Sequence, residues 1–398
     1  MSRDAHSASP QEPPLHPGEG RGEGAALPPQ RLTSLDVFRG LTIAGMFVVN
    51  TPGSWEHAFS PLLHAEWHGW TYTDTIFPFF LFVVGVSMAF SFSTRRALGA
   101  GRWALVLHTL PRAVIVFLLG FGLNGLSVLL FHRAHVRIPG VLQRIAVCFF
   151  FAALVYLAGG RRALLPVAAV LLVGYWALMT LVPVPGYGVG RLDVEGNLAA
   201  YIDRAVLGTH TWKHNPAWDP EGLLSTLPAI ATTLFGIAGG EILRGKADWS
   251  RKLTTLMAGG AILLSLGLLW SVWFPINKNL WTSSYSLFMA GLAAICLAIC
   301  IWVVDVKGWK TWSIPFQWLG SNAIALFVGA TLATILLLAI KMDAGDGVRR
   351  SAYGTIYRTL FAHTDDPRVG SLLFALCFCG FWVLVGGLLY KKRIFVKV

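Results

Sequence analysis

The sequence predicts an all-α fold: a polytopic transmembrane helix bundle of about ten helices, with both termini in the cytoplasm. Three observations support this prediction: only 13% of the 398 residues are charged, 55% are hydrophobic, and long apolar segments fill more than half of the chain. A soluble domain carries about 25% charged residues, whereas a bilayer-spanning helix needs about 20 mainly apolar residues. The composition excludes a cytosolic globular enzyme, a disordered chain and a secreted disulfide scaffold.

The apolar segments follow a polar N-terminal region. Residues 1–30 are rich in Pro, Gly, Glu and Ser and predict a disordered cytoplasmic tail, which precedes a transmembrane domain over 31–398. The expected spans are 36–52, 73–93, 111–131, 140–158, 163–182, 223–243, 253–273, 282–304, 314–340 and 371–390. The first is the weakest, because it begins with Asp36 and Arg39 and ends near Asn50. Continuous apolar runs also argue against an outer-membrane barrel, whose strands alternate polar and apolar residues.

Positive charges predict the orientation of the bundle. An even number of spans leaves both termini on one side, and that side holds 16 Lys and Arg in short connections and the C-terminal tail, against 11 on the other. The positive-inside rule then places both termini in the cytoplasm. The net charge of +12 is explained by these cations, so no nucleic-acid partner is expected. Two long outward loops, about 183–222 and 341–370, are expected to cover a site.

The first outward loop contains a dense group of polar and aromatic residues. His64 and His68 are four residues apart, as in helical zinc motifs, but Glu66 lies at the wrong angle for the H-E-x-x-H pattern and Gly69 disfavours a helix. The five cysteines lie inside apolar runs, with no zinc spacing. We therefore expect no metal cofactor.

Acid–base chemistry by His64 is the alternative for this loop. Histidine titrates near neutral pH, so it can accept and return a proton. Asp74 follows ten residues later, just inside the second expected span. A carboxylate within a membrane span is costly and marks a functional site by default. The competing explanation is that Asp74 only caps the helix and that His64 is an interfacial loop residue.

Several sequence blocks resemble the heparan-α-glucosaminide N-acetyltransferase family. They begin with R-L-T-S-L-D-V-F-R-G-L-T-I-A-G-M-F-V-V-N (31–50) and L-L-H-A-E-W-H-G-W-T (62–71). R-I-P-G-V-L-Q-R (137–144), D-P-E-G-L-L-S-T (219–226), P-I-N-K-N-L-W-T-S-S-Y (275–285) and L-G-S-N-A-I (319–324) follow in the family's order. The resemblance covers about residues 31 to 390, and the blocks are specific together rather than singly.

The resemblance implies a membrane enzyme that takes acetyl from cytosolic acetyl-CoA and delivers it to an amino sugar across the membrane. The family's H-A-x-W-x-G motif maps its catalytic histidine onto His64, and the neighbouring polar residues of its helices onto Asn50 and Asp74. The large lumenal N-terminal domain of the animal enzyme has no counterpart before residue 31, which leaves the acceptor open. The expected location is the inner membrane of a bacterium.

Three arginines are candidates for binding the cosubstrate. Arg39 lies three residues after Asp36, so the two share a helix face and form either an interfacial ion pair or a contact to the phosphates of CoA. Arg137 and Arg144 flank the start of the fourth expected span. A buried Arg144 needs a partner, and Asp74 is a candidate.

The acceptor is expected to contact polar and aromatic residues of the outward loops. The candidates are Trp67, Glu221, Asn277, Lys278 and Trp281, although the tryptophans also suit an interfacial aromatic belt. Asp219 is expected to cap the sixth span, and Asn322 to hydrogen-bond another helix.

The prediction is a membrane acetyltransferase in which His64 acts as a general base or carries the acetyl group. The rival hypothesis is a permease for amino sugars or cell-wall fragments, which would use the same pocket without consuming acetyl-CoA. The expected partners are acetyl-CoA, a sugar acceptor and the lipid bilayer. The sequence leaves open the acceptor, the covalent step, the roles of the two long loops and the oligomeric state, a homodimer included.

Overall fold

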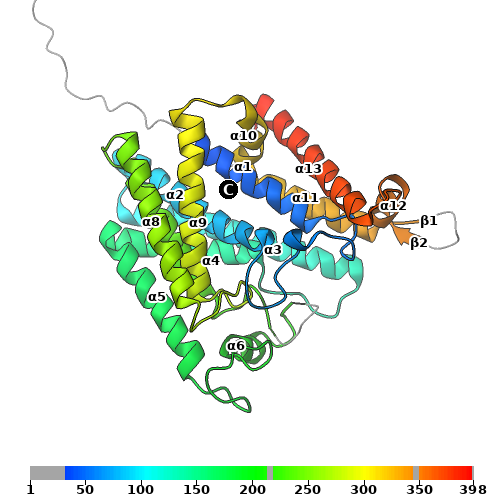
Figure 1. Cartoon of the computed structure of the whole chain (residues 1–398), viewed down its shortest axis with the longest axis horizontal. Coiled ribbons are helices and arrows are strands. Elements are labelled where there is room, and N and C mark those ends of the chain that lie inside the picture. The colour runs from blue at the N-terminus through cyan, green and yellow to red at the C-terminus, as the bar shows by residue number, and fades with distance from the viewer. Residues whose placement is uncertain (1–31, 213–217, 344–348, 397–398) are drawn as a thin grey trace, which may run out of the picture. The chain divides into compact units, whose positions relative to one another are not determined.

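The computed structural model describes residues 32–212, 218–343 and 349–396, and within them the chain is mainly helical. Thirteen α-helices lie in the described residues, and the only sheet there is a two-stranded hairpin (Figure 1). The predicted all-α membrane bundle is confirmed. The tail predicted over residues 1–30 lies outside the described part of the chain.

Eight helices in the described residues are long and apolar enough to cross a membrane. They are α2 (Tyr72–Ala97), α3 (Arg102–Phe131), α4 (Val141–Gly159), α5 (Arg161–Leu181), α7 (Thr226–Arg244), α8 (Trp249–Trp270), α9 (Ser283–Ile301, continued by the π-helical turn Trp302–Val306) and α13 (Pro367–Lys391). The predicted first span is α1 (Thr33–Asn50), a helix whose polar ends leave it outside this group of eight.

The predicted span 314–340 is not one straight helix. It consists of α10 (Ile314–Ser321), which a 3₁₀ turn (Thr311–Ser313) precedes, and α11 (Ala323–Ala339), with a bend of 75° at Asn322. The Asn322 amide donates to the carbonyl of Ile394 (3.0 Å) and accepts from the amide of Val396 (2.8 Å). Asn322 therefore binds the segment after α13 rather than another helix. Counted as one span, the pair gives nine where ten were predicted.

One predicted boundary was wrong by more than two turns. α3 begins at Arg102 and runs through Pro111, where the sequence suggested a start. Proline is tolerated within membrane helices because neighbouring groups satisfy the freed carbonyl. The extension carries His108, which lines a cavity described below together with Arg112 of the predicted part of the helix.

The helices pack closely where glycines face a neighbouring backbone. α2 packs on α7, and a Cβ at Gly236 would lie 2.1 Å from the carbonyl oxygen of Phe82. α1 packs on α10, and a Cβ at Gly40 would lie 1.8 Å from the carbonyl oxygen of Phe316. Small residues at such contacts are typical of membrane helix pairs, which gain packing energy by close approach.

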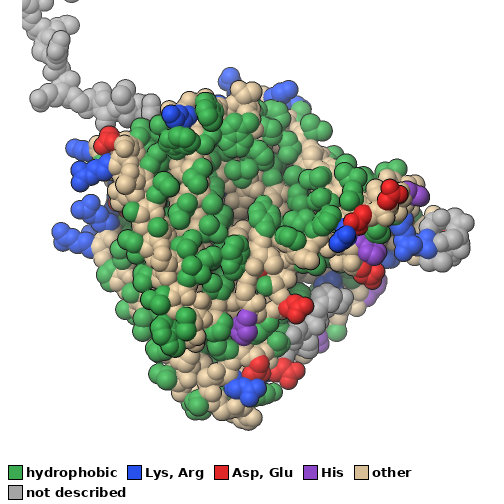
Figure 2. Space-filling model, viewed as in Figure 1, with side chains coloured by type: hydrophobic (Ala, Val, Ile, Leu, Met, Phe, Trp, Pro, Cys, Tyr) green, Lys and Arg blue, Asp and Glu red, His purple; other side chains and the backbone are tan. Residues whose placement is uncertain are grey.

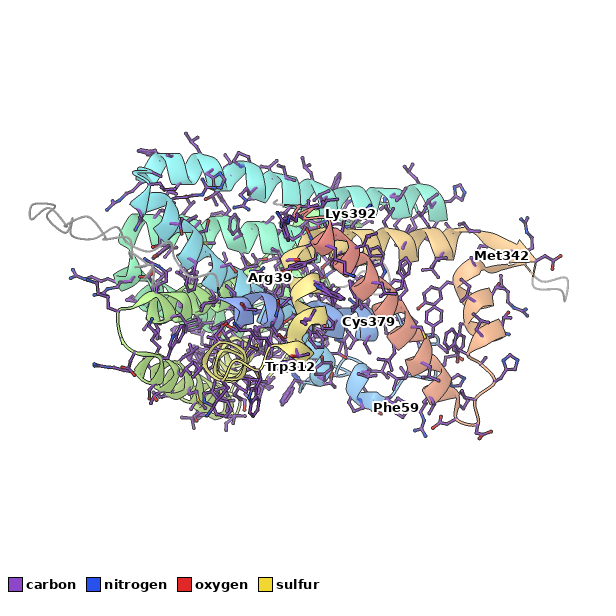
Figure 3. All side chains as sticks on the ribbon, turned by 90° about the horizontal axis from the view of Figure 1, so that it is seen from above. Arg39, Phe59, Trp312, Met342, Cys379 and Lys392 are labelled. Atoms are coloured by element: carbon purple, nitrogen blue, oxygen red, sulfur yellow. The ribbon has the colours of Figure 1, made fainter. Side chains whose placement is uncertain are left out.

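The loops predicted to face outward meet at one end of the bundle, here called the His64 end. Trp67 donates to Leu192 (2.8 Å), the amide of Ile138 to His210 (3.0 Å), and the amide of Gly69 to Ile276 (2.7 Å). Short elements lie within these loops: the 3₁₀ turn Ser60–Leu62, α6 (Leu198–Leu207), β1 (Lys341–Asp343), β2 (Arg349–Ser351) and α12 (Ala352–Leu360). Phe59 and Met342 lie towards the same end of the view in Figure 3.

The opposite end, here called the Arg39 end, joins the connections predicted to be cytoplasmic. Tyr156 of α4 donates to Glu241 of α7 (2.5 Å), and Arg244 donates to Ser93 of α2 (2.5 Å). In Figure 2, hydrophobic side chains cover most of the middle of the viewed face, and charged side chains gather towards its edges. The division of loops between two ends agrees with the predicted order of spans. Which end faces the cytoplasm stays a prediction.

Candidate functional site

His64 and Asp74 form a direct pair at the His64 end. Nδ1 of His64 lies 2.6 Å from Oδ1 of Asp74, and the exposed fractions of the two side chains are 46% and 1%. An ionised Asp74 accepts a hydrogen bond from Nδ1–H, which leaves Nε2 with its lone pair available. The arrangement suits a histidine that accepts a proton or acts as a nucleophile at Nε2.

The first turn of α2 fixes the Asp74 carboxylate. Its second oxygen, Oδ2, accepts from the amides of Ala65 (3.0 Å) and Thr71 (3.0 Å), and Thr71 and Asp74 form a reciprocal capping box. The positive end of the helix dipole favours a negative charge here. One carboxylate therefore both caps α2 and pairs with His64, whereas a catalytic role of the pair stays a prediction.

A cavity of about 460 Å³, here called the histidine cavity, brings together five predicted site residues. Its lining includes Asn50, His64, Arg137, Glu221 and Lys278. Its walls are mainly apolar side chains of α1, α2, α4 and α11. A concave, apolar space with a few converging polar groups is the usual form of a small-molecule site.

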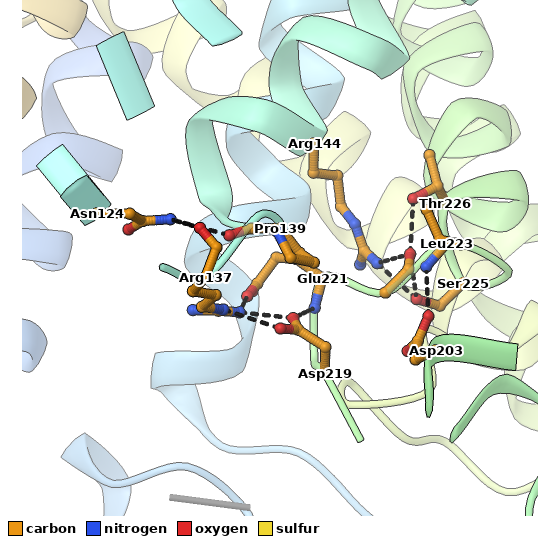
Figure 4. A network of polar contacts seen from close by, with 11 residues as sticks. Asn124, Arg137, Pro139, Arg144, Asp203, Asp219, Glu221, Leu223, Ser225 and Thr226 are labelled. Atoms are coloured by element: carbon orange, nitrogen blue, oxygen red, sulfur yellow. Dashed lines mark hydrogen bonds and ion pairs between the residues drawn. The ribbon is translucent and has the colours of Figure 1, made fainter. Parts of the chain in front are cut away.

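Arg137 is held by two carboxylates from the loop before α7 (Figure 4). It donates to Asp219 through Nε (2.9 Å) and Nη2 (2.6 Å), and it also pairs with Glu221. Asp219 lies ahead of the helix rather than capping it, because α7 begins at Thr226 with Ser225 as its N-cap residue. Asn124 of α3 donates to the carbonyls of Arg137 (2.8 Å) and Pro139 and fixes the loop that carries this arginine.

Burial and neighbouring charges shift the pKa values of this group. Burial raises the pKa of Glu221, but the charges of Arg137 and Lys278 outweigh it, so the pKa lies below its ordinary value. Burial raises the pKa of Asp219, in spite of its bonds to Arg137. Burial lowers the pKa of the Lys278 ammonium, which Glu221 and Asp74 partly offset. Lys278 and Glu221 thus place a basic and an acidic side chain side by side in the lining of the histidine cavity.

Arg144 does not pair with Asp74, contrary to the sequence prediction. Its Nη2 donates to the carbonyl of Gly222 (2.9 Å) and to the hydroxyl of Ser225 (2.5 Å), and its guanidinium lies 5.2 Å from the centre of the Trp281 ring. Arg144 lines neither cavity described here. It holds the loop that carries Asp219 and Glu221, and Asp74 is occupied by His64.

The predicted aromatic contacts are in different places from those expected. Trp281 is completely buried against Phe77 and Tyr285, and Trp67 packs on Trp218 behind the cavity wall. Asn277 is also buried, with Oδ1 accepting from the amide of Leu280 (2.9 Å). None of Trp67, Trp281 and Asn277 lines the histidine cavity.

Trp212 and Trp218 line the histidine cavity, and the sequence analysis missed both. Their ring centres are 5.4 Å apart. Trp218 immediately precedes the singled-out D-P-E-G block, so its position beside Asp219 was a usable signal.

The two histidines of the metal alternative do not share a helix face. The segment from residue 63 to 71 is irregular. Nδ1 of His68 lies 3.3 Å from Nδ2 of the Asn277 side chain. The described residues contain no cluster of three or more His, Cys, Asp or Glu side chains arranged for a metal.

A second cavity of about 290 Å³, here called the arginine cavity, lies towards the Arg39 end and is lined by Arg39, His108 and Arg112. Arg39 donates to Asp36 (3.1 Å), to the carbonyl of Gly320 (3.0 Å) and to Ser87 (2.7 Å). The predicted ion pair with Asp36 is present, and Arg39 also faces a cavity. Figure 3 labels Arg39 near the middle of the bundle. His108 was missed because the first turns of α3 were predicted to be a loop, whereas Arg112 lay inside the predicted span and was not singled out.

The fold and these two cavities define a polytopic α-helical membrane protein with a buried polar site. A family model described as "Heparan-alpha-glucosaminide N-acetyltransferase, catalytic" matches residues 31–267. The chain belongs to this family.

Two curated relatives are each described as "Heparan-alpha-glucosaminide N-acetyltransferase". The one from Homo sapiens is 29% identical over 94% of this chain, and the one from Mus musculus is 29% identical over 92% of it. The chain spans 61% and 60% of their respective lengths.

Proposed function

We propose that this protein is a membrane acetyltransferase that moves acetyl from acetyl-CoA to the amine of an amino sugar. The observation that carries the proposal is the His64–Asp74 pair, whose histidine lines an apolar cavity large enough for a small molecule. Membership of the acetyltransferase family supports the reaction class.

The arginine cavity suits the phosphorylated end of acetyl-CoA. Arg39 and Arg112 supply guanidinium groups, which match phosphate geometry better than ammonium groups do. Ser87, Ser91 and Ser321 add hydroxyl groups along the same lining. The apolar walls of the histidine cavity suit an uncharged thioester better than a phosphate.

His64 accepts the proton of the attacking amine, or it carries the acetyl group on Nε2 before the amine attacks. In both routes Asp74 orients the imidazole and balances the positive charge that forms on it. Asn50 lines the same cavity and is our candidate donor to the oxyanion that forms on the carbonyl oxygen when the thioester carbon is attacked. Such a donor contributes roughly 3–4 kcal/mol in known enzymes.

The acceptor is an amino sugar that enters from the His64 end. Trp212 and Trp218 offer aromatic surface for the sugar ring, while Glu221 and Lys278 offer an acceptor and a donor of hydrogen bonds. The proposal places this end in the periplasm and the Arg39 end in the cytoplasm of a bacterial inner membrane. The motive is the larger number of cations in the connections of the Arg39 end.

The decisive experiment incubates purified protein with labelled acetyl-CoA and a panel of amino sugars. We expect acetylated sugar and free CoA, and we expect neither product without the sugar in a direct-transfer mechanism. Labelled protein formed from acetyl-CoA alone would indicate a carrier histidine. Sugar uptake into vesicles without acetyl-CoA, and with no acetylated product, would contradict the proposal and favour a permease.

Membrane sidedness needs a separate measurement. Cysteine variants at Tyr201 and His363 should react with an impermeant reagent added from the periplasm, and variants at Arg96 and Lys391 should not. The reverse pattern would invert the proposed orientation without affecting the reaction.

A further inference from the structure

Three apolar side chains lie where the two cavities meet. Phe80, Ile145 and Ile324 line both the histidine cavity and the arginine cavity. They come from three different helices, α2, α4 and α11. All three are hydrophobic, although polar groups line both cavities on either side of them.

α2 lines both cavities, one after the other along its length. Its lining residues recur every three or four positions, which places them on one helix face. They are Thr73, Ile76 and Phe77 in the histidine cavity, Phe80 in both, and Val84, Ser87, Met88, Ser91 and Phe92 in the arginine cavity. Phe80 is therefore the point on this face at which one cavity gives way to the other.

Two other helices repeat this order. On α4, Val141 and Leu142 line the histidine cavity, Ile145 lines both, and Phe149 lines the arginine cavity. On α1, Asn50 lines the histidine cavity and Arg39 the arginine cavity. Ile324 lies two residues after the bend at Asn322, so the first turn of α11 lies at the junction.

We propose that Phe80, Ile145 and Ile324 form an apolar neck that seals the membrane when no cosubstrate is bound and admits only the uncharged arm of acetyl-CoA. The passage of the acetyl-CoA arm rests on the proposed function, whereas the seal does not. A hydrophobic constriction excludes water and ions because they lose hydration on entering it. The same cost keeps the phosphates of the cosubstrate in the arginine cavity, whereas the uncharged pantetheine arm passes through.

The spacing along α2 is compatible with this arrangement. Asp74, which holds His64, and Ser87, which binds Arg39, are separated by 13 residues, or about 20 Å at the rise of an α-helix. The head group and the thioester of one extended molecule would then lie on opposite sides of the neck. The neck acts as a positioning element because it fixes which part of the cosubstrate reaches His64.

The first test fills the neck with Ile324→Trp. Adenosine 3′,5′-bisphosphate, which has the nucleoside and two of the three phosphates of CoA without the arm, should bind as it does to the unaltered protein. Acetyl transfer should fall at least about 100-fold, because a misplaced reacting group costs about that much. Transfer at the normal rate would overturn the neck proposal.

The second test widens the neck with Phe80→Ala and measures proton leak into vesicles that contain a pH-sensitive dye. We expect a leak at least about 10-fold faster than that of the unaltered protein, since a wider apolar constriction wets more easily. Phe149→Ala and Phe327→Ala are matched controls, because Phe149 lines only the arginine cavity and Phe327 only the histidine cavity. A leak no faster than in these controls would overturn the proposal.

The two tests separate the neck from the proposed reaction. If Ile324→Trp also abolishes binding of the bisphosphate, that variant is misfolded or blocked at the arginine cavity. The proton leak of Phe80→Ala then supports or overturns the neck by itself. If the unaltered protein neither binds acetyl-CoA nor transfers acetyl, the proposed function fails, and the leak still supports or overturns the seal. Normal transfer by the unaltered protein and by Ile324→Trp would refute the neck and leave the function intact.

Discussion

His64 and Arg137 of the histidine cavity lie in loops, whereas Arg39 of the arginine cavity lies within α1 and is held by the helices around it. His64 and Arg137 each bind a carboxylate, and those carboxylates also accept backbone amides. Arg39 instead reaches Asp36 of its own helix, Ser87 of α2 and Gly320 of α10. The difference fits the proposed division of labour, since chemistry needs a fixed proton acceptor while phosphate binding needs mainly positive charge.

The largest effect is expected from His64→Ala. General-base assistance contributes about 10²–10⁴ in rate, so acetyl transfer should fall at least about 100-fold while acetyl-CoA still binds. His57→Ala and His68→Ala are the controls, because these residues share the loop but do not line the histidine cavity. Rates measured with one amino sugar and saturating acetyl-CoA decide the outcome, and near-normal turnover in His64→Ala would refute the assignment.

Asp74→Asn should give the second-largest loss. The amide cannot balance an imidazolium charge and can favour the wrong tautomer of His64, so we expect transfer to fall about 10- to 100-fold as part of the general-base contribution. Thr71→Val is the control, because it removes a hydroxyl that lies 2.6 Å from the carbonyl oxygen of Leu63 and 3.2 Å from the Asp74 carboxylate but keeps the charge beside His64. Equal losses in the two variants would mean that Asp74 acts only through the structure of the helix terminus.

Arg39→Ala tests the arginine cavity. If Arg39 binds a phosphate, acetyl-CoA should bind about 10-fold more weakly, which corresponds to about 1.4 kcal/mol and to one charge-assisted hydrogen bond. The remaining affinity should depend less on salt. Arg96→Ala is the matched control, since Arg96 packs over the ring of Tyr156 and does not line the cavity. Unchanged affinity with reduced thermal stability would mean that Arg39 does not bind the cosubstrate and only forms a structural ion pair with Asp36.

The smallest expected effect is a pH dependence of stability that comes from Asp203, which binds the loop that carries Glu221. Asp203 of α6 accepts from the amide of Leu223 (2.8 Å), and burial, helped by the charge of Asp219, raises the pKa of Asp203 to about 7 against the opposing charge of Arg144. The folded protein therefore keeps a proton that the unfolded chain releases above its ordinary pKa of 3.8. This contribution to stability is complete below about pH 4 and disappears as the pH rises through about 7.

Melting temperatures of wild type and Asp203→Asn, measured from pH 4 to pH 8, would check this sign. We expect the wild type to lose stability with rising pH and the variant to show a flatter profile. The same slope in both proteins would contradict a protonated Asp203 in the folded state.

The sequence was sufficient where a property belongs to one segment. Apolar runs predicted the helices, and their order correctly predicted which loops meet at each end of the bundle. The pair of His64 and Asp74 was also accessible, because ten residues and one helix start bring them together. Local signals failed at Pro111, which does not begin α3, and at Asn322, where one apolar run contains a bend of 75°.

Contacts between distant segments depended on the tertiary structure. Arg137 binds Asp219 and Arg144 binds the carbonyl of Gly222, partners about 80 residues away that no local pattern connects. The burial of Trp281 and the exposure of Trp218 to the cavity also depend on how the loops fold over the bundle.

The sequence by itself determined that this is a helical membrane protein with an ionisable pair at the start of its second span. Hydrophobic length and period suffice for that, because each membrane helix satisfies its own backbone hydrogen bonds. Only the tertiary structure decided that polar groups line two cavities and that Phe80, Ile145 and Ile324 line both of them. A cavity is the space left between packed helices, and its position depends on side chains from all of them at once.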